Sequence, residues 1–142
     1  MCKRGDIIVI YSYMDNSITL PRHPFVVFDV EGGEIGGLTF DIVALVMSSI
    51  KNDTQAQRKL SYIGNIGIPF EKQKISSSNG GNGINSFVKC DQLYYFNLSK
   101  TPYKVIGSLT PDALEEVTKY INKLAETGIQ FREIIEICDF NG

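Results

Sequence analysis

The chain has 142 residues, of which 43% are hydrophobic and 21% charged, and its formal net charge is −2. This length suits one compact domain that buries roughly two-thirds of the surface of its unfolded chain, and the composition excludes the class of disordered proteins. No apolar run approaches the roughly 20 residues that cross a bilayer, and the charged start has no apolar segment of a secretion signal behind it, so we expect a cytoplasmic protein that binds no membrane.

The net charge conceals a difference between two parts of the chain. Residues 1–109 hold 11 Lys and Arg against 9 Asp and Glu, whereas residues 110–142 hold 3 against 7. Phosphate binding needs a local cluster of positive charge and not a basic protein, so this balance permits a nucleic-acid ligand without arguing for one. The three cysteines lack the spacing of a disulfide framework or a zinc site, which predicts reduced thiols and no metal site; we also expect no cofactor.

Apolar runs in the first third of the chain predict three strands. They cover residues 6–11, 25–28 and 40–47, and the third run stops at two serines. Loops are predicted at residues 15–17 and across the glycine-rich residues 31–37. Strands joined by such short connections indicate a mostly antiparallel sheet or a small barrel.

The middle of the chain is less regular. Residues 51–59 are polar without a clear period and form either a loop or a short helix. Residues 76–83 have the composition of a flexible connector, and they lack the glycine and lysine pattern of a loop that cradles nucleotide phosphates. Further strands are predicted at residues 86–90, 91–96 and 104–106.

Helix signals are strong near the C-terminus. Thr110 is a good N-cap, Pro111 stands at the first helical position, and Gly128 supplies a stop. Apolar residues at three- and four-residue spacing then form one stripe, so we predict a helix over residues 110–127 that packs on the sheet. Residues 129–140 could be a strand or a short helix, and we divide the chain into a domain of residues 1–128 and an acidic extension of residues 129–142.

Four short segments, in a specific order and at specific distances, match one protein family. They are Lys3–Ile8, His23–Val27, Val88–Gln92 and Ile106–Thr110. They resemble, in turn, the opening strand, the Arg-Pro-apolar strand, the Val-x-Cys-Asp-Gln segment and the stretch before the C-terminal helix of PemK/MazF toxins. The resemblance covers roughly residues 3–126, with residues 51–86 poorly matched.

The resemblance implies a fold and an activity. The fold is an SH3-like antiparallel barrel with a C-terminal helix, assembled as a homodimer. The activity is metal-independent cleavage of single-stranded RNA, in a groove that a cognate antitoxin would occupy. CcdB-type gyrase poisons share the barrel and are not nucleases, so the alternative is a binding module for gyrase or an antitoxin that has lost catalysis.

Metal-free RNA cleavage needs a base, an acid and fixed positive charge on the transition state. His23, the only histidine, stands at the position of the family Arg, and an imidazole with a pKa of about 6.5 can serve as base or acid. Arg22 beside it could hold the phosphate. The alternative is that His23 is an ordinary residue between a loop and a strand.

Two serines lie near the position of the family hydroxyl, which falls on Met47. The side chain of Ser49 should point to the same side of the sheet as that of Met47, whereas Ser48 should point to the other side unless the strand has already ended. We therefore assign Ser49 to catalysis, and Ser48 with Lys51 to RNA binding. Both serines could instead serve as turn residues.

The segment around Cys90 supplies the remaining candidates. Asp91 matches the family aspartate and is the second predicted proton-transfer residue, although an aspartate after a strand often caps backbone N–H groups. Lys89 stands where active members carry Arg, and with Gln92 it is predicted to bind RNA. Cys90 should point inward.

Aromatic and acidic residues raise two further hypotheses. The run at residues 94–96 could stack on bases or form sheet core. Glu133, Glu136 and Asp139 of the acidic extension could fold over the basic groove as an internal block.

Overall fold

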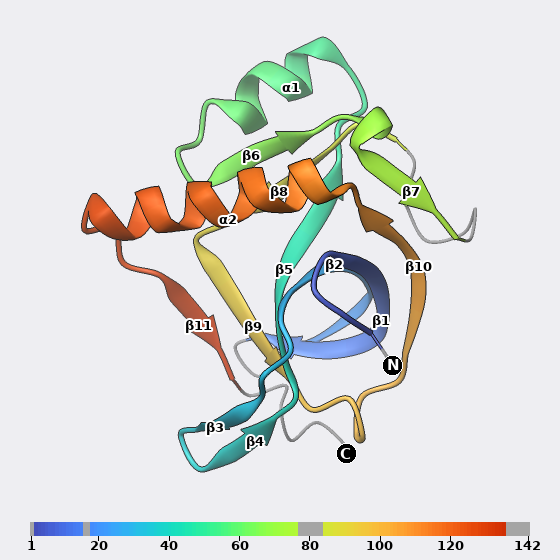
Figure 1. Cartoon of the computed structure of the whole chain (residues 1–142), viewed down its shortest axis with the longest axis vertical. Helices are drawn as coiled ribbons and strands as arrows, with labels where there is room; N and C mark the ends of the chain where they lie inside the picture. The colour runs from blue at the N-terminus through green and yellow to red at the C-terminus, as the bar shows by residue number, and fades with distance from the viewer. Residues whose placement is uncertain (1, 16–17, 77–83, 136–142) are drawn as a thin grey trace.

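The computed structural model describes residues 2–15, 18–76 and 84–135 (Figure 1). Its helices are α1 (Asp53–Leu60) and α2 (Pro111–Glu126), with a 3-10 turn at Phe70–Lys72. Its strands are β1 (Asp6–Asp15), β2 (Ile18–Asp29), β3 (Gly33–Ile35), β4 (Leu38–Phe40), β5 (Ile42–Ser49), β6 (Asn65–Ile68), β7 (Gln73–Ile75), β8 (Ser86–Lys89), β9 (Gln92–Phe96), β10 (Tyr103–Leu109) and β11 (Arg132–Ile134).

The main sheet follows the order β11-β9-β5-β2-β1-β10-β7, with β8 paired to the end of β5 and β6 paired to β8. All of these pairs are antiparallel except β11 with β9, and β3 and β4 form a separate hairpin. The prediction of a mostly antiparallel β fold with a helix after the last long strand is confirmed. No pairing in the described parts of the chain joins the two ends of the sheet, so these strands do not close into a barrel.

Neighbouring side chains along a strand point to opposite sides of the sheet, and each side carries its own cluster of buried apolar residues. We call the side that packs on α2 the helix face, and the other side the inner face. Helix-face residues include Ile7, Val9, Val26, Leu45, Met47, Val88 and Cys90. Inner-face residues include Ile8, Ile10, Tyr13, Phe25, Val27, Ala44, Val46, Tyr94 and Phe96.

The sheet curls so that the inner face is concave. The rings of Tyr13 in β1 and Tyr94 in β9 lie 5.9 Å apart, although β2 and β5 stand between these strands. Three strand spacings in a flat sheet would separate them by roughly 14 Å. The Tyr94 hydroxyl also donates to Asp15 at 3.1 Å, and Arg132 of β11 forms an ion pair with the same carboxylate. Side chains thus link β1 to strands that it does not reach through its backbone.

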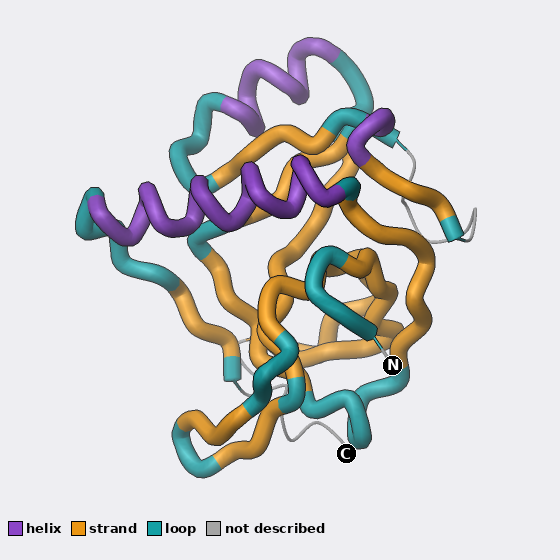
Figure 2. The backbone as a smooth tube through the Cα atoms, viewed as in Figure 1, coloured by secondary structure: helices purple, strands orange, loops and turns teal. Residues whose placement is uncertain are grey.

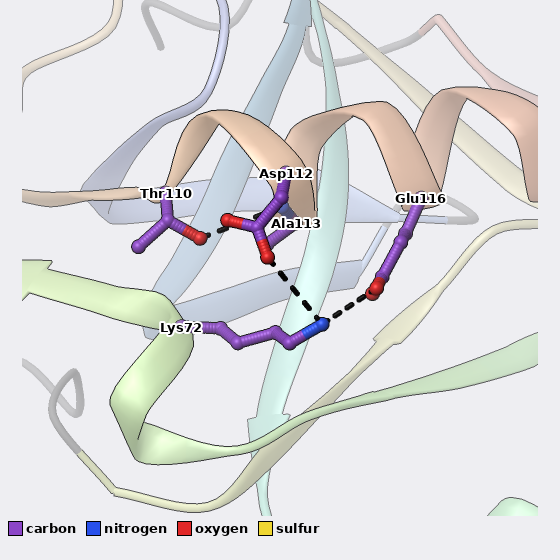
Figure 3. A network of polar contacts seen from close by, with 5 residues as sticks. All are labelled: Lys72, Thr110, Asp112, Ala113 and Glu116. Atoms are coloured by element: carbon purple, nitrogen blue, oxygen red, sulfur yellow. Dashed lines mark hydrogen bonds and ion pairs between the residues drawn. The ribbon is translucent and has the colours of Figure 1, made fainter.

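The start of α2 is fixed by a polar network (Figure 3). The Thr110 hydroxyl accepts the N–H of Ala113 at 3.4 Å, which satisfies one of the free donors of the first turn. The Lys72 ammonium lies 2.5 Å from Glu116 and 3.7 Å from Asp112, so it ties the 3-10 turn to the helix. The predicted helix is confirmed, and its buried stripe is Ala113, Val117, Ile121 and Leu124.

Four predicted strands extend further in the structure than in the sequence pattern, namely β1, β2, β5 and β10. β2 begins at Ile18 and contains Pro24, which is tolerated because the pairing of β2 with β5 starts at Phe25. β5 does not stop before its serines but runs through Ser49, because β8 provides pairing partners for both.

Two segments predicted as loops or left open contain regular structure. Residues 31–37 contain β3 and the turn of the β3–β4 hairpin, and the turn uses Gly36 and Gly37 with φ of 59° and 83°. Residues 51–59 contain α1, whose N-cap Asn52 accepts the N–H of Gln55 at 2.8 Å. The helices lie at one end of the molecule and the β3–β4 hairpin at the other (Figure 2).

The acidic extension contributes a strand. β11 pairs in parallel with β9, so residues 132–134 belong to the main sheet. The remainder of the extension, and residues 77–83 of the predicted flexible connector, lie outside the described residues. Within the described ranges, neither helix has the length and apolar character needed to cross a lipid bilayer.

The cap of α2 gives the first prediction. Thr110→Ala should lower the free energy of unfolding by about 1 kcal/mol, because it leaves the Ala113 N–H of the first turn without its acceptor. Thr110→Ser should restore most of the loss, and Thr54→Ala in α1, at an exposed helical threonine, should change stability by less than about 0.5 kcal/mol. Urea denaturation measures all three, and equal stabilities of Thr110→Ala and the parent would contradict the cap.

Candidate functional site

His23 lies on the inner face near the middle of β2, two residues before the part of β2 that pairs with β5. It alternates with Phe25, whose ring centroid is 5.9 Å from that of the imidazole, and it pairs with Ile10 of β1. Its Nδ1 lies 3.0 Å from the backbone oxygen of Pro24. When Nδ1 donates its proton to that carbonyl, Nε2 carries the lone pair, and the ring is oriented as a base.

The surroundings of His23 favour the neutral imidazole. Burial lowers its pKa from 6.5, the hydrogen bond to the Pro24 carbonyl opposes this effect, and the positive charge of Lys89 lowers the pKa further. At neutral pH the ring is therefore an uncharged base, and not a cation such as the family Arg.

Lys89 shares the inner face through the alternation of β8. Val88 belongs to the helix-face core, so Phe87 and Lys89 point to the opposite side. The two residues open onto a cavity of about 370 Å³ beside the C-terminal turn of α1, which we call the α1 pocket. Its lining includes Arg58, Lys59, Tyr62, Phe87, Lys89 and Gln92, with the Lys59 ammonium 5.8 Å from the centre of the Phe87 ring.

The serines divide between the two faces. Ser48 pairs with Phe87 and follows Met47, which is fully buried on the helix face, so Ser48 lies on the side that carries His23. Ser49 keeps the facing of Met47, as the sequence pattern predicted, and that facing turns it away from His23. The structure thus brings Ser48, and not Ser49, to the face of His23.

Asp91 is held apart from the lining of the α1 pocket. Its side chain is 7% exposed, and its Oδ2 accepts a hydrogen bond of 2.6 Å from the Tyr62 hydroxyl. Gly64 packs against it so tightly that a Cβ there would lie 2.6 Å from Asp91 Cγ. The described residues show no contact between Asp91 and His23. Asp91 thus fastens the turn after α1 to β9, and it does so through the hydroxyl of Tyr62 and not through backbone N–H groups.

The predicted phosphate ligands are placed differently from one another. Gln92 lines the α1 pocket together with Lys89. Lys51 lines a separate cavity of about 430 Å³, and its N–H donates to Gln55 at 2.8 Å. Arg22 is exposed and alternates with His23, so it points away from the inner face, and no hydrogen bond or ion pair joins it to another described residue.

The aromatic run is sheet core. Tyr94 and Phe96 are buried on the inner face, and Tyr95 is buried on the other side, where its hydroxyl donates to Glu133 at 2.5 Å. Glu133 therefore does not cover the basic face, and Glu136 and Asp139 lie outside the described residues. Cys90 is fully buried on the helix face, as predicted, and burial raises the pKa of its thiol to about 12.

Sequence reasoning missed the residues that α1 contributes, because this segment did not match the family pattern. Arg58 and Lys59 stand in the last turn of the helix, and Tyr62, which is 51% exposed, follows it. One signal could have indicated a helix there. Asn52 is a good N-cap, and it is followed by an acidic first turn and a basic last turn.

A larger cavity lies elsewhere and has the wrong charge for a phosphate. It has about 960 Å³ and lies between the β3–β4 hairpin and Cys2, with Glu31, Glu34 and Asp41 in its lining. Three carboxylates repel an anionic strand, so the inner face near His23 and the α1 pocket form the better candidate site for RNA. In the described part of the chain, no three His, Cys, Asp or Glu side chains gather as a metal site.

Comparison with known proteins adds no further assignment. No model of a protein family matches the chain, and no curated protein matches it.

The pKa of His23 predicts a pH dependence. The folded pKa lies below the unfolded value of about 6.5, so the unfolded chain takes up the proton first as the pH falls. The stabilisation from the neutral ring is therefore complete above pH about 6.5 and is lost progressively below it. An NMR titration of the ring protons should give a pKa under 6.5, and Lys89→Gln should raise it.

Lys74→Gln is the matched control for this titration, because Lys74 is an exposed lysine of β7 at the other edge of the sheet. It should leave the pKa of His23 unchanged. A His23 pKa of 6.5 or more in the parent protein would show that its surroundings do not favour the neutral ring, and equal effects of the two lysine variants would show that the imidazole does not face Lys89.

The link between Tyr62 and Asp91 is tested by a double-mutant cycle. Tyr62→Phe removes only the donor, and Asp91→Ala removes the acceptor together with a buried carboxylate. The double variant should be more stable than the sum of the single losses predicts, by about 1–2 kcal/mol, because the hydrogen bond can be lost only once. Strictly additive losses in urea denaturation would mean that the two groups do not interact in solution.

Proposed function

We propose that this protein is an endoribonuclease of the PemK/MazF toxin kind, which cuts single-stranded RNA at the inner face around His23. The observation that carries the proposal is that His23 of β2, Ser48 of β5 and Lys89 of β8 point to the same side of the sheet, where burial keeps the imidazole neutral and the Lys89 charge lowers its pKa further. A base beside a fixed positive charge is what cleavage through the 2′-hydroxyl requires. The four segments that resemble the toxin family support the same reaction.

In this proposal the RNA supplies its own nucleophile. His23 Nε2 takes the proton of a 2′-hydroxyl, the 2′-oxygen forms a bond to the adjacent phosphorus, and the bond from phosphorus to the 5′-oxygen breaks. Lys89 stabilises the negative charge on the phosphorane and gives a proton to the departing 5′-oxygen. The products are a 2′,3′-cyclic phosphate and a 5′-hydroxyl, and the reaction consumes no water, metal or cofactor.

The other predicted residues take supporting roles. Ser48 and Gln92 contact the RNA. Ser48 points to the same side of the sheet as Lys89, and Gln92 lines the α1 pocket with Lys89. Asp91 acts as a positioning residue through Tyr62, and not as the acid. The homodimer and the cognate antitoxin that the resemblance implies, and the cytoplasmic location that the sequence leads us to expect, belong to the same proposal.

Purified protein should cut a long single-stranded RNA in the presence of EDTA and leave 2′,3′-cyclic ends. His23→Gln should reduce the rate by about 10²- to 10⁴-fold, the range for loss of a general base. Lys89→Gln should also slow cleavage, whereas Lys74→Gln should not. Electrophoresis of end-labelled RNA measures the rates, and abolition by EDTA or an unchanged rate in His23→Gln would refute the mechanism.

A second candidate function has one specific observation in its favour. His23 is neutral, so the position of the family Arg lacks a permanent cation. The groove could then bind a protein such as gyrase or an antitoxin without cutting RNA. Failure to cleave any RNA, together with a stable complex with one of these proteins, would favour this binding module.

A further inference from the structure

The α1 pocket extends the candidate site beyond the groups that carry out the reaction. Its helix and turn come from residues 51–64, which lie in the part of the chain that does not match the toxin pattern, and only Lys89 and Gln92 come from a matched segment. Its volume of about 370 Å³ falls in the range of small-ligand pockets. We propose that the α1 pocket binds one nucleotide of the RNA strand next to the cleaved phosphate, an inference that rests on the proposed function.

The charge of the pocket suits a phosphate group. Arg58, Lys59 and Lys89 enter its lining from α1 and β8, and no carboxylate of the described residues lines it. The nearby carboxylate of Asp91 is covered and accepts the Tyr62 hydroxyl. Three cations around one concave surface attract the backbone of a single strand and raise its local concentration.

Aromatic rings in the pocket suit a nucleobase. The ring of Tyr62 is half exposed, so it offers a face on which a base can stack. Phe87 is almost fully buried and forms the floor under Lys59. Cations beside an accessible aromatic ring are the combination that binds single-stranded nucleic acid, whereas a groove for an acidic protein segment needs no stacking surface.

Hydrogen bonds hold the backbone beside the pocket in place, which reduces the entropic cost of binding. The Tyr62 hydroxyl is fixed to Asp91, and the Asn65 side-chain amide donates to the Lys59 carbonyl at 2.8 Å. The Ser61 hydroxyl donates to the Arg58 carbonyl at 2.8 Å. These bonds hold the last turn of α1 in place before a ligand arrives.

Gln92 gives the pocket a group that can read a base. Its side-chain amide makes no hydrogen bond to the residues that the structure describes, and it lines the pocket next to Lys89. An amide presents a donor and an acceptor together, which is the arrangement that pairs with the edge of a base. We therefore assign base preference at this nucleotide to Gln92, and binding strength to the cations and Tyr62.

The experiment measures binding separately from cleavage. Fluorescence anisotropy with a labelled single-stranded RNA of eight nucleotides is carried out in the His23→Gln background, so that the strand stays intact. Tyr62→Ala should weaken binding by about 5- to 150-fold, the effect of losing one stacked base. Arg58→Ala with Lys59→Ala should weaken binding and reduce the slope of log affinity against log salt by about 1.4, for two lost phosphate contacts.

Matched controls separate a local effect from a general one. Lys74→Ala with Lys104→Ala removes two exposed lysines from β7 and β10, at the other edge of the sheet, and should cause a smaller loss. Tyr62→Phe keeps the ring, so it should retain more affinity than Tyr62→Ala. Circular dichroism establishes that each variant is folded, and Gln92→Ala should reduce differences in affinity among homopolymeric RNAs.

The outcomes distinguish the pocket from the reaction. If Tyr62→Ala and the Arg58/Lys59 double variant bind RNA as well as the lysine controls do, while His23→Gln still abolishes cleavage, the pocket assignment is wrong and the proposed nuclease activity is supported. If no RNA is cut but binding depends on Tyr62 and the α1 cations, the nuclease is wrong and the pocket binds RNA without cleavage. Equal competition by inorganic phosphate and by the oligonucleotide would show that the pocket takes an anion and not a nucleotide, and would overturn the proposal.

Discussion

The burial of both faces of one curled sheet is the constraint on which the rest of the structure depends. Every side chain of β2, β5 and β8 must point either to α2 or to the concave side, and the apolar residues between the polar ones fix which side each takes. His23, Ser48 and Lys89 share a side because Phe25, Val46 and Val88 have no other place to pack. The packing of the core therefore places the candidate site, whose residues His23, Ser48 and Lys89 are only partly buried.

The sequence predicted the elements whose signals are local and missed those that depend on partners. Thr110 and Pro111 indicate the start of α2 without reference to any other segment, and the predicted helix agrees with the structure. The end of β5 was predicted too early, because Ser48 and Ser49 are turn residues by composition and strand residues only once β8 pairs with them. Likewise, the sequence places Asp91 beside Lys89, but only the contacts with Tyr62 and Gly64 reveal that its carboxylate is covered.

The imidazole at position 23 differs in chemistry from the arginine at the matching position of PemK/MazF toxins, which this chain resembles in four segments. A guanidinium is a permanent cation with a planar fork for phosphate, whereas the imidazole of His23 is neutral and can accept a proton. Positive charge must then come from elsewhere, and Lys89 with the basic end of α1 is the source on this side of the molecule. The basic last turn of α1 thus brings positive charge beside a face on which His23 is neutral.

The ion pair of Arg132 with Asp15 has a consequence for the order of folding. It joins residues that are 117 positions apart, and with Tyr94 it draws the first long hairpin against the last strands of the sheet. A contact between such distant segments closes a very large loop, so we expect it to form after the local hairpins and α2. The concave surface would then reach its final curvature only in the last stage of folding, when β11 pairs with β9.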